Sequence, residues 1–347
     1  MLELRGLTKR YGDVTAVDDL SCVFPPGQVT GFLGPNGAGK TTTLLLALGL
    51  QRPDAGTVRV GGRRYTALNA PMREVGALLD AQAVHPNRSG RDHLRALAAG
   101  NRLPTARVGE VLERVGLSAV AGRRAGTFSL GMKQRLGIAA ALLGDPAVLL
   151  LDEPINGLDP GGIAWVRTLL RELAAEGRTV VLSSHLMSEM EQTADHLIVI
   201  GRGRVIADTS LTAFLDRAAP AGLLVRAEDP GFPAALSAAG GSVREVPEGG
   251  WLVSGLPAYE IGRLALNRRI VLTELSPRRG SLEEVFMSAT ASSTEFTGHA
   301  GAGVPGVPGV PGVPGVAGVA GVAGVAGVAG VAGVSGGDPV RSARGSR

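Results

Sequence analysis

One octet of residues restricts what this chain can fold into more than any other part of the sequence: Gly34-Pro35-Asn36-Gly37-Ala38-Gly39-Lys40-Thr41. It fits the pattern G-x-x-x-x-G-K-[ST], in which a glycine-rich turn joins a buried strand to a helix. Residues 29–33 are apolar and are expected to form the strand, and residues 41–50 the helix. Such a turn points successive backbone N–H groups into one concavity, which also faces the positive end of the helix dipole. The octet therefore predicts a binding loop for nucleotide phosphates.

Side chains at the end of the octet complete this loop. The ammonium group of Lys40 can reach the β- and γ-phosphates, and the hydroxyl group of Thr41 can ligate Mg²⁺. Thr42, the next residue, is counted among the expected nucleotide contacts. Lysine occurs only at positions 9, 40 and 133, so its presence in the octet does not reflect an abundant residue type.

Two carboxylates end an apolar run at residues 148–153. A buried strand of a parallel sheet delivers its last residues to the crevice in which ligands bind. Asp152 can hold the Mg²⁺ shell there, because Mg²⁺ prefers hard oxygen ligands. Glu153 can orient or deprotonate the attacking water. Paired carboxylates at a strand end are often only solvated caps, but these follow an intact phosphate loop, which favours the catalytic interpretation.

Length and composition allow two domains with an aliphatic core, since 44% of the 347 residues are hydrophobic and only 3% aromatic. The chain is mildly basic, but no run of Lys and Arg interleaved with aromatic residues occurs, so no nucleic-acid partner is expected. The single Cys22 cannot form an intrachain disulfide, which suits a reducing cytoplasm. No secretory leader and no convincing transmembrane helix is recognised, so another chain would have to supply any membrane span.

The order of the expected elements predicts an α/β core with two subdomains. Residues 2–24 alternate like antiparallel strands that a turn at residues 11–13 interrupts. The pattern is helical from residue 85 to residue 145, and strands then alternate with helices up to residue 207. Strands separated by helices predict a mainly parallel sheet. An antiparallel β subdomain would precede this sheet, and a helical subdomain would be inserted into it.

A second unit is expected after residue 215. Residues 223–275 follow the order β-α-β-β-α-β, which is typical of a small ferredoxin-like α+β domain, and a helix at residues 281–287 is expected to close it. From residue 303, glycine recurs at every third position in Gly-Val-Pro and then Gly-Val-Ala repeats. This composition favours a disordered, flexible coil over a collagen-like triple helix, which needs more proline. The expected division is an ATP-binding domain at 1–215, an accessory domain at 216–290 and a low-complexity tail at 291–347.

Two further motifs flank the carboxylate strand: Phe128-Ser129-Leu130-Gly131-Met132-Lys133-Gln134-Arg135 before it and Asn156-Gly157-Leu158-Asp159 after it. With every motif in order, residues 1–206 resemble the ATP-binding subunit of an ABC transporter, which is an ATPase with a P-loop NTPase core. The resemblance is greatest to bacterial subunits that export drugs or antibiotic peptides, such as bacitracin, daunorubicin and lantibiotics. The run at residues 281–286 is similar to the C-terminal extension of those subunits.

The resemblance implies roles for individual residues, with Lys40, Glu153 and His185 as the catalytic set. Tyr11 would stack on the adenine of ATP, a contact worth about 1–3 kcal/mol. Ser129 and Gly131 would cap the γ-phosphate of ATP that is bound to the opposite subunit of a homodimer. Asp159 would link the two sites across the dimer. His185, which follows the strand at residues 179–182, would contact the γ-phosphate.

The sequence departs from the family pattern at two places. The signature motif has Leu130 where the family usually has Gly and Met132 where it usually has Gln, so we expect altered rather than absent function. Where the family commonly has a Gln that contacts Mg²⁺, this chain has Asp80, and Gln82 comes two residues later. Alignment position favours Asp80 as the metal ligand, and Gln82 is the alternative if the loop shifts.

The resemblance implies ATP and Mg²⁺ as cofactors and a separate integral-membrane permease as partner. The protein would act at the cytoplasmic face of the membrane and power the efflux of a drug, antibiotic, peptide or lipid. One alternative is a soluble ABC ATPase that acts on DNA or ribosomes, but such proteins usually carry two cassettes or long coiled coils. The other is a structural protein whose tail is the working part. The intact Lys40, Asp152, Glu153 and His185 disfavour it.

Overall fold

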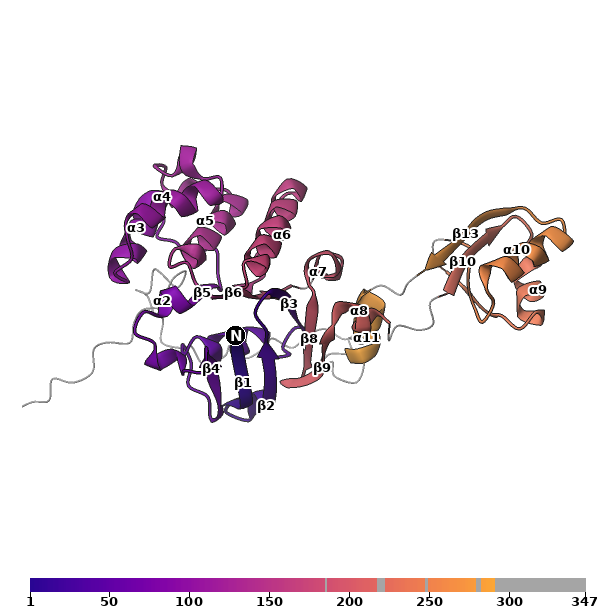
Figure 1. Ribbon diagram of the computed structural model, residues 1–347, viewed down its shortest axis with the longest axis horizontal. Helices are drawn as coiled ribbons and strands as arrows, with labels where there is room; N and C mark the ends of the chain where they lie inside the picture. The colour runs from indigo at the N-terminus through magenta and orange to yellow at the C-terminus, as the bar shows by residue number, and fades with distance from the viewer. Residues whose placement is uncertain (185, 217–221, 247–248, 279–281, 291–347) are drawn as a thin grey trace, which may run out of the picture.

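The computed structural model describes residues 1–184, 186–216, 222–246, 249–278 and 282–290. The larger body carries two sheets and most of the helices, and a small α+β unit stands to one side of it (Figure 1). Two predictions, the role of His185 and the coil expected at residues 291–347, lie outside the described residues.

A six-stranded sheet supports the phosphate loop. Its strand order is β5-β6-β7-β3-β8-β9, in which the first five strands are parallel and β9 is antiparallel to β8. This pairing confirms the predicted, mainly parallel sheet. Since both of its faces are covered, its central strands are almost entirely buried. The strands are β3 (Gln28–Leu33), β5 (Val75–Leu78), β6 (Val148–Asp152), β7 (Thr179–Ser183), β8 (His196–Gly201) and β9 (Arg204–Ser210).

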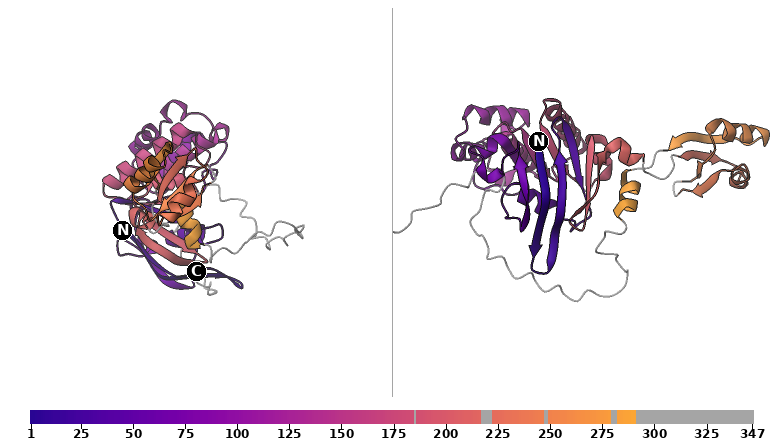
Figure 2. Two further views of the ribbon diagram at one scale, coloured as in Figure 1. Left: turned by 90° about the vertical axis from the view of Figure 1, so that its right-hand side faces the viewer. Right: turned by 60° about the horizontal axis from the view of Figure 1, so that its bottom comes forward.

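A three-stranded antiparallel sheet lies beside the larger one and confirms the predicted β subdomain (Figure 2). Its order is β2-β1-β4, formed by β1 (Leu2–Tyr11), β2 (Val14–Phe24) and β4 (Ala55–Val60). One apolar cluster joins side chains of both sheets to those of α1 (Lys40–Ala47). Within it, the rings of Phe24 and Phe32 meet edge to face with their centroids 5.7 Å apart. The helix that follows the phosphate loop is therefore fixed by packing against both sheets.

The predicted helical subdomain is confirmed between β5 and β6, where α3, α4 and α5 pack together at one end of the body (Figure 1). Ser89 begins α3 with a side-chain cap, because its Oγ accepts a hydrogen bond from the Asp92 amide at 3.0 Å. No helix in the described part of the chain is both long and apolar enough to cross a bilayer. The helices of the body are α2 (Pro71–Glu74), α3 (Gly90–Gly100), α4 (Ala106–Arg114), α5 (Leu130–Leu142), α6 (Pro160–Ala175), α7 (Met187–Thr193) and α8 (Leu211–Leu215), with 3-10 turns at Tyr65–Ala67, Ser118–Val120 and Ala125–Thr127.

The small unit has the predicted order β-α-β-β-α-β. Its four strands form one antiparallel sheet in the order β11-β12-β10-β13. A separate apolar core, which includes Val225, Phe232 and Ile261, lies between this sheet and its two helices. The elements are β10 (Gly222–Ala227), α9 (Phe232–Ala238), β11 (Ser242–Glu245), β12 (Trp251–Ser254), α10 (Ala258–Asn267) and β13 (Leu272–Arg278).

The last helix, α11 (Leu282–Thr290), was predicted to close the small unit, and that prediction was wrong. It packs instead against α7 and α8 of the larger body. Val285 and Phe286 are buried there in the same cluster as Phe214, and the Leu282 amide donates to Oε2 of Glu191 at 3.4 Å. The physical reason is that α9 and α10 already cover the small sheet, which leaves the apolar stripe of α11 to pack on the body.

Candidate nucleotide-binding site

The phosphate loop runs from β3 into α1 through two residues in the left-handed backbone region. The φ angle is 81° at Gly37 and 101° at Gly39. A Cβ atom on Gly39 would lie 2.3 Å from the carbonyl oxygen of Ala16, a backbone atom that cannot move away cheaply. The backbone conformation and this close approach therefore both require glycine at position 39. The other predicted contacts lie in the same loop or in the first turn of α1: Gly34, Pro35, Asn36, Ala38 and Thr42.

Lys40 begins α1, and its side chain folds back over the loop. Its Nζ donates hydrogen bonds to the carbonyl oxygens of Gly34, at 2.6 Å, and Pro35, at 3.2 Å. Burial lowers the pKa of Lys40, and the nearby carboxylates of Glu153 and Asp152 oppose that shift. The carbonyl oxygens of the loop and the carboxylates of Glu153 and Asp152 thus hold the ammonium group of Lys40 beside the loop, where it can bind a phosphate.

Asp152, the last residue of β6, hydrogen-bonds to side chains on two other elements. Its Oδ2 accepts a hydrogen bond from Oγ1 of Thr41 at 2.9 Å, and its Oδ1 accepts one from Oγ of Ser183. Carboxylate and hydroxyl oxygens are the ligands that Mg²⁺ takes in combination with water and substrate phosphates. The predicted pair Thr41 and Asp152 therefore lies together beside the phosphate loop, and its chemistry fits this metal. Ser183 was not among the predicted site residues, although a hydroxyl group at the end of the next parallel strand is a usable signal.

Glu153 adopts a left-handed backbone conformation with φ of 50°, which is uncommon for a residue other than glycine. Its N–H lies 3.2 Å from the carbonyl oxygen and 3.1 Å from the hydroxyl oxygen of Ser183, and donates to both. Its own carbonyl oxygen accepts a hydrogen bond from Nε2 of Gln134 at 3.0 Å. Gln134 was likewise not among the predicted site residues. The backbone of Glu153 is thus held on both sides, and its carboxylate is close enough to Lys40 to affect the pKa of that lysine.

Comparison with known proteins shows the family to which the chain belongs. A family model described as ABC transporter matches residues 17–156. The bacitracin transport ATP-binding protein BcrA of Enterococcus faecalis is 40% identical over 215 residues, which are 61% of this chain and 70% of BcrA. The uncharacterized ABC transporter ATP-binding protein YdbJ of Bacillus subtilis is 33% identical over 303 residues, which are 85% of this chain and 97% of YdbJ. The chain belongs to the family of ABC transporter ATP-binding proteins.

The solved structures agree with this family. The ATP-binding subunit of an ABC transporter is 28% identical and matches with a TM-score of 0.57, over 62% of this chain and 92% of the other. The chain is thus an ABC ATPase, the ATP-binding subunit of a transporter. A second family model, for a domain of unknown function, matches residues 221–283 and therefore covers the small unit.

Tyr11 of this ABC ATPase ends β1, and its side chain is 45% exposed. Its hydroxyl group donates a hydrogen bond to Oε1 of Gln51, and Nζ of Lys9 lies 5.5 Å from the centre of its ring. The hydroxyl group is fixed by this hydrogen bond, while much of the ring is exposed to solvent, as stacking on a base would require. That role stays a prediction.

Ser129 and Asp159 both serve as N-caps in the ABC ATPase. Oγ of Ser129 accepts a hydrogen bond from the Met132 amide at 3.2 Å and begins α5. Oδ1 of Asp159 accepts one from the Gly162 amide at 3.0 Å and begins α6. Gly131 lies in the first turn of α5, where a Cβ atom would meet the side chain of Leu158 at 3.3 Å. Both motifs are thereby placed at exposed helix starts, which is compatible with contacts across a dimer.

The alternative metal contacts, Asp80 and Gln82, are both exposed and lie just after β5. Oδ1 of Asp80 accepts a hydrogen bond from the Gln82 amide at 2.7 Å, which closes a short turn. Among the described residues, no group of three or more His, Cys, Asp or Glu side chains has the arrangement of a metal site. The choice between Asp80 and Gln82 therefore stays a prediction.

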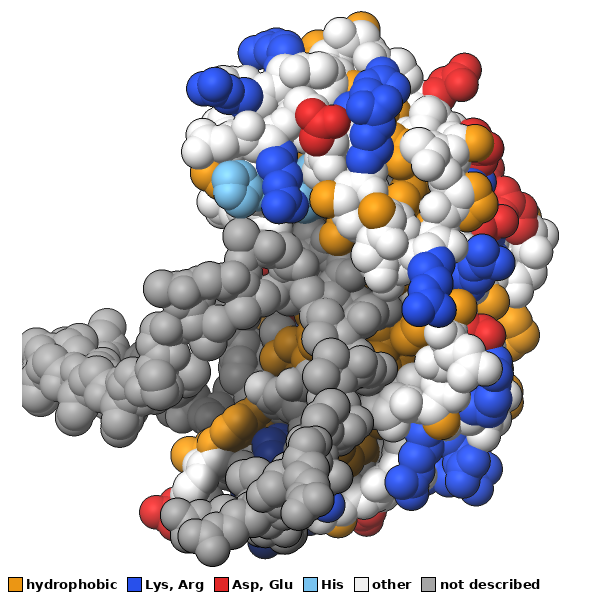
Figure 3. All heavy atoms as spheres, turned by 90° about the vertical axis from the view of Figure 1, so that its left-hand side faces the viewer, with side chains coloured by type: hydrophobic (Ala, Val, Ile, Leu, Met, Phe, Trp, Pro, Cys, Tyr) orange, Lys and Arg blue, Asp and Glu red, His pale blue; other side chains and the backbone are white. Residues whose placement is uncertain are grey.

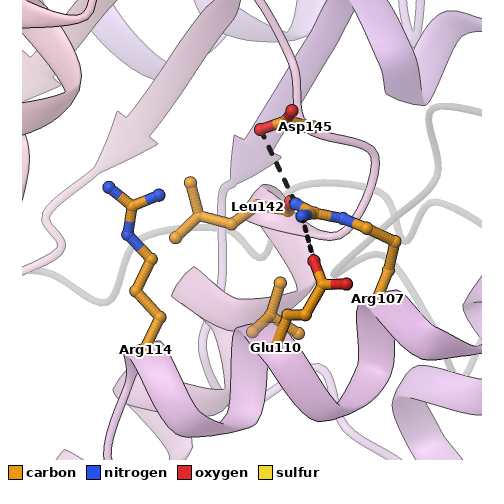
Figure 4. A pocket seen from close by; sticks show the side chains of 6 residues that line it. Arg107, Glu110, Arg114, Leu142 and Asp145 are labelled. Atoms are coloured by element: carbon orange, nitrogen blue, oxygen red, sulfur yellow. Dashed lines mark hydrogen bonds and ion pairs between the residues drawn. The ribbon is translucent and has the colours of Figure 1, made fainter.

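A hollow of about 180 Å³ lies away from the phosphate loop, between α4 and the end of α5 (Figure 4). Arg107 reaches across it and donates to the carbonyl oxygens of Leu142, at 3.1 Å, and Leu143, at 3.3 Å. The same guanidinium group forms ion pairs with Glu110 and Asp145. A cation that bonds to the last carbonyls of a helix stabilises that helix end, so these charges have a structural role.

The side of the molecule drawn in Figure 3 bears on the expectation that nucleic acid is not a partner. Where residues are described on this face, Lys and Arg side chains alternate with acidic and apolar ones. A surface that binds nucleic acid typically gathers its basic side chains into one patch or stripe. This one face carries both basic and acidic side chains where residues are described, and the expectation about nucleic acid stays a prediction.

Proposed function

We propose that this ABC ATPase powers the export of an antibiotic, peptide, drug or lipid through a separate integral-membrane permease, at the cytoplasmic face of the membrane. The observation that carries the catalytic part is the grouping of Lys40 and Thr41, at the start of α1, with Asp152 and Glu153, at the end of β6. The name of BcrA, a bacitracin transport protein, supports the class of cargo. The alternative, an ABC ATPase acting on DNA or ribosomes, has no specific observation in its favour.

Each member of the group has a distinct role in ATP hydrolysis. The amides between Gly34 and Thr41, together with the ammonium group of Lys40, bind the β- and γ-phosphates. Thr41 and Asp152 would hold Mg²⁺, whose charge offsets that of the phosphates. Glu153 accepts a proton from the attacking water and orients it in line with the γ-phosphate. Asp80 completes the metal-contacting loop, and Gln82 is its alternative.

Two copies of the chain form the working unit in this proposal. Ser129 and Gly131 of one copy cap the γ-phosphate held by the other, and Asp159 joins the two sites. Tyr11 stacks on the adenine, and His185 contacts the γ-phosphate. Closure of the dimer depends on contacts that the γ-phosphate makes, so hydrolysis biases a two-state equilibrium toward opening.

We also propose that the chain is divided as its sequence suggests, into an ATP-binding domain at 1–215, an accessory region at 216–290 and a tail at 291–347. A separate apolar core in the small unit supports the boundary after α8. The packing of α11 on α7 and α8 attaches the accessory region to the ATP-binding domain at its far end.

Glu153→Gln tests the catalytic assignment. The amide keeps the size of the side chain but cannot accept the proton, so phosphate release should fall about a hundredfold or more, while ATP still binds and drives dimerisation. Turnover is measured by phosphate release and dimerisation by light scattering with ATP and Mg²⁺. The matched control is Glu172→Gln, an exposed glutamate on α6, which should keep the parental rate. An unchanged rate in the Glu153 variant would overturn the assignment.

Co-expression tests the transport part of the proposal. The ABC ATPase should sediment with membranes when it is co-expressed with an exporter permease encoded by the same organism. Without that permease it should remain in the supernatant. Sedimentation with ribosomes or retention on DNA, independent of any permease, would instead support the alternative function.

A further inference from the structure

The backbone of Glu153 is held in a conformation that it would not adopt by itself. Its φ of 50° lies in the left-handed region, which side chains other than glycine rarely occupy. Such a residue persists only where its surroundings hold it. Two of the restraints come from Ser183 on the neighbouring strand, which accepts hydrogen bonds from the Glu153 amide. They fix the side of the peptide that faces β7.

Two groups restrain the other side, at the carbonyl oxygen of Glu153: the Asn156 amide, which donates to it at 3.2 Å, and the side chain of Gln134. Its Nε2 donates to the carbonyl oxygen of Glu153 at 3.0 Å, across 19 residues of sequence. Gln134 is only 4% exposed and lies on α5, whose following residues 136–142 are buried as well. A buried amide is unfavourable unless it is hydrogen-bonded, so this glutamine is explained by the bond that it makes.

The same helix contacts the loop after Glu153 at a second point. Gly157 has φ of 72°, and a Cβ atom there would lie 2.1 Å from Cδ2 of Leu130. The Leu130 side chain therefore lies against Gly157, and the left-handed backbone at this position favours glycine. The first residues of α5 thus contact both ends of the short turn that follows β6, through a hydrogen bond at Glu153 and an apolar contact at Gly157.

We propose that Gln134 is a positioning residue for ATP hydrolysis: its side-chain amide holds the carbonyl oxygen of Glu153 and so keeps the Glu153 carboxylate aimed at the attacking water. This inference rests on the proposed role of Glu153. Without the Gln134 amide, the Asn156 amide still restrains this carbonyl oxygen, but the peptide can shift toward a more common conformation, which moves the carboxylate. Displacement of a catalytic group by about 1 Å can cost about a hundredfold in rate.

Gln134→Met removes the donor and keeps the length and burial of the side chain. It should lower kcat for ATP hydrolysis about tenfold to a hundredfold and leave the KM for ATP within about twofold, because no phosphate contact changes. The same substitution in a Glu153→Gln background should change kcat by less than about twofold, since the group that it positions is already gone. Nucleotide affinity and the thermal unfolding midpoint are measured in parallel to show that each variant is folded. Gln28→Met, at an exposed glutamine at the start of β3, is the control and should keep the parental kcat.

The double variant separates a positioning role from a merely structural one. If Gln134→Met lowered kcat by the same factor in both backgrounds, or left kcat unchanged in the parental protein, the inference would be wrong. A loss of ATP affinity together with kcat would also contradict it. If instead Glu153→Gln alone kept the parental rate, the proposed function itself would fail, so the two failures can be told apart.

Discussion

Lowering the pH from about 7.5 to about 5 should destabilise the folded protein through His93, in the helical subdomain. This imidazole is 2% exposed and lies on α3. Burial, reinforced by the positive charges of Arg88 and His85, lowers the pKa of His93 to about 4. A histidine in the unfolded chain has a pKa of about 6.5. As the pH falls, the unfolded state therefore binds a proton before the folded state does.

The size of the effect follows from the two pKa values. At about pH 7 both states are essentially neutral at this residue, so stability is unaffected. Between about pH 6.5 and pH 5 only the unfolded chain is protonated. Each pH unit of that interval costs about 1.36 kcal/mol, and the unfolding free energy falls by about 2 kcal/mol in total. The loss ends as the pH passes below the folded pKa of about 4.

Urea unfolding at about pH 7.5 and about pH 5 tests this reasoning, in a Trp251→Phe background in which Trp165 alone reports on the body. His93→Gln removes the titrating group. Its unfolding free energy should decrease by about 2 kcal/mol less than that of the parental protein over this pH interval, with an unchanged dependence on urea. Equal decreases in the two proteins would show that His93 does not titrate as the structure implies.

Two further substitutions test features of the fold. Gly39→Ala places a Cβ atom 2.3 Å from the carbonyl oxygen of Ala16, so this variant should bind a fluorescent ATP analogue at least about tenfold more weakly than the parental protein. The control, Gly61→Ala, is also at a positive φ but has open space around it and should bind the analogue normally. Equal affinities of the two variants would refute the requirement for glycine at position 39. Phe286→Ala should destabilise the body by about 3 kcal/mol in urea unfolding, because its ring is 6% exposed. Leu266→Ala, at a side chain 76% exposed, should have little effect, and matching midpoints for both variants would contradict the packing of α11.

The sequence was sufficient to predict the elements whose causes are local. The glycine pattern of the phosphate loop and the apolar run that ends at Asp152 each determine their own conformation. Placing them together needed only the rule that parallel strands present their carboxyl ends at one edge. The turn near residues 11–13 and the order of elements in the small unit were equally local, and both are present.

The contacts that the sequence could not reveal are those between distant segments. The hydroxyl group of Ser183 donates a hydrogen bond to Asp152 because β7 lies beside β6 in the sheet. The sequence alone does not specify this order of strands. Gln134 donates a hydrogen bond to the backbone carbonyl oxygen of Glu153. Every residue has such a carbonyl group, so the residue type at position 153 does not indicate this bond. The position of α11 is a similar case, because an apolar stripe such as that of Val285 and Phe286 fits any uncovered apolar surface. Only the complete arrangement shows which surface was left uncovered.

Helix α5 connects two proposed roles, one toward the nucleotide of the partner and one toward the catalytic carboxylate of its own chain. Its N-cap, Ser129, is proposed to contact the nucleotide of the partner, while Gln134 holds Glu153 of the same chain. The five residue steps from Ser129 to Gln134 correspond to a rise of about 7.5 Å along a hydrogen-bonded helix, which can shift or tilt but not lengthen. If ATP binding across the proposed dimer moves Ser129, the helix would carry that movement to Gln134 and to the carbonyl oxygen of Glu153. The same hydrogen bond that positions Glu153 would then also couple the two proposed sites of the dimer.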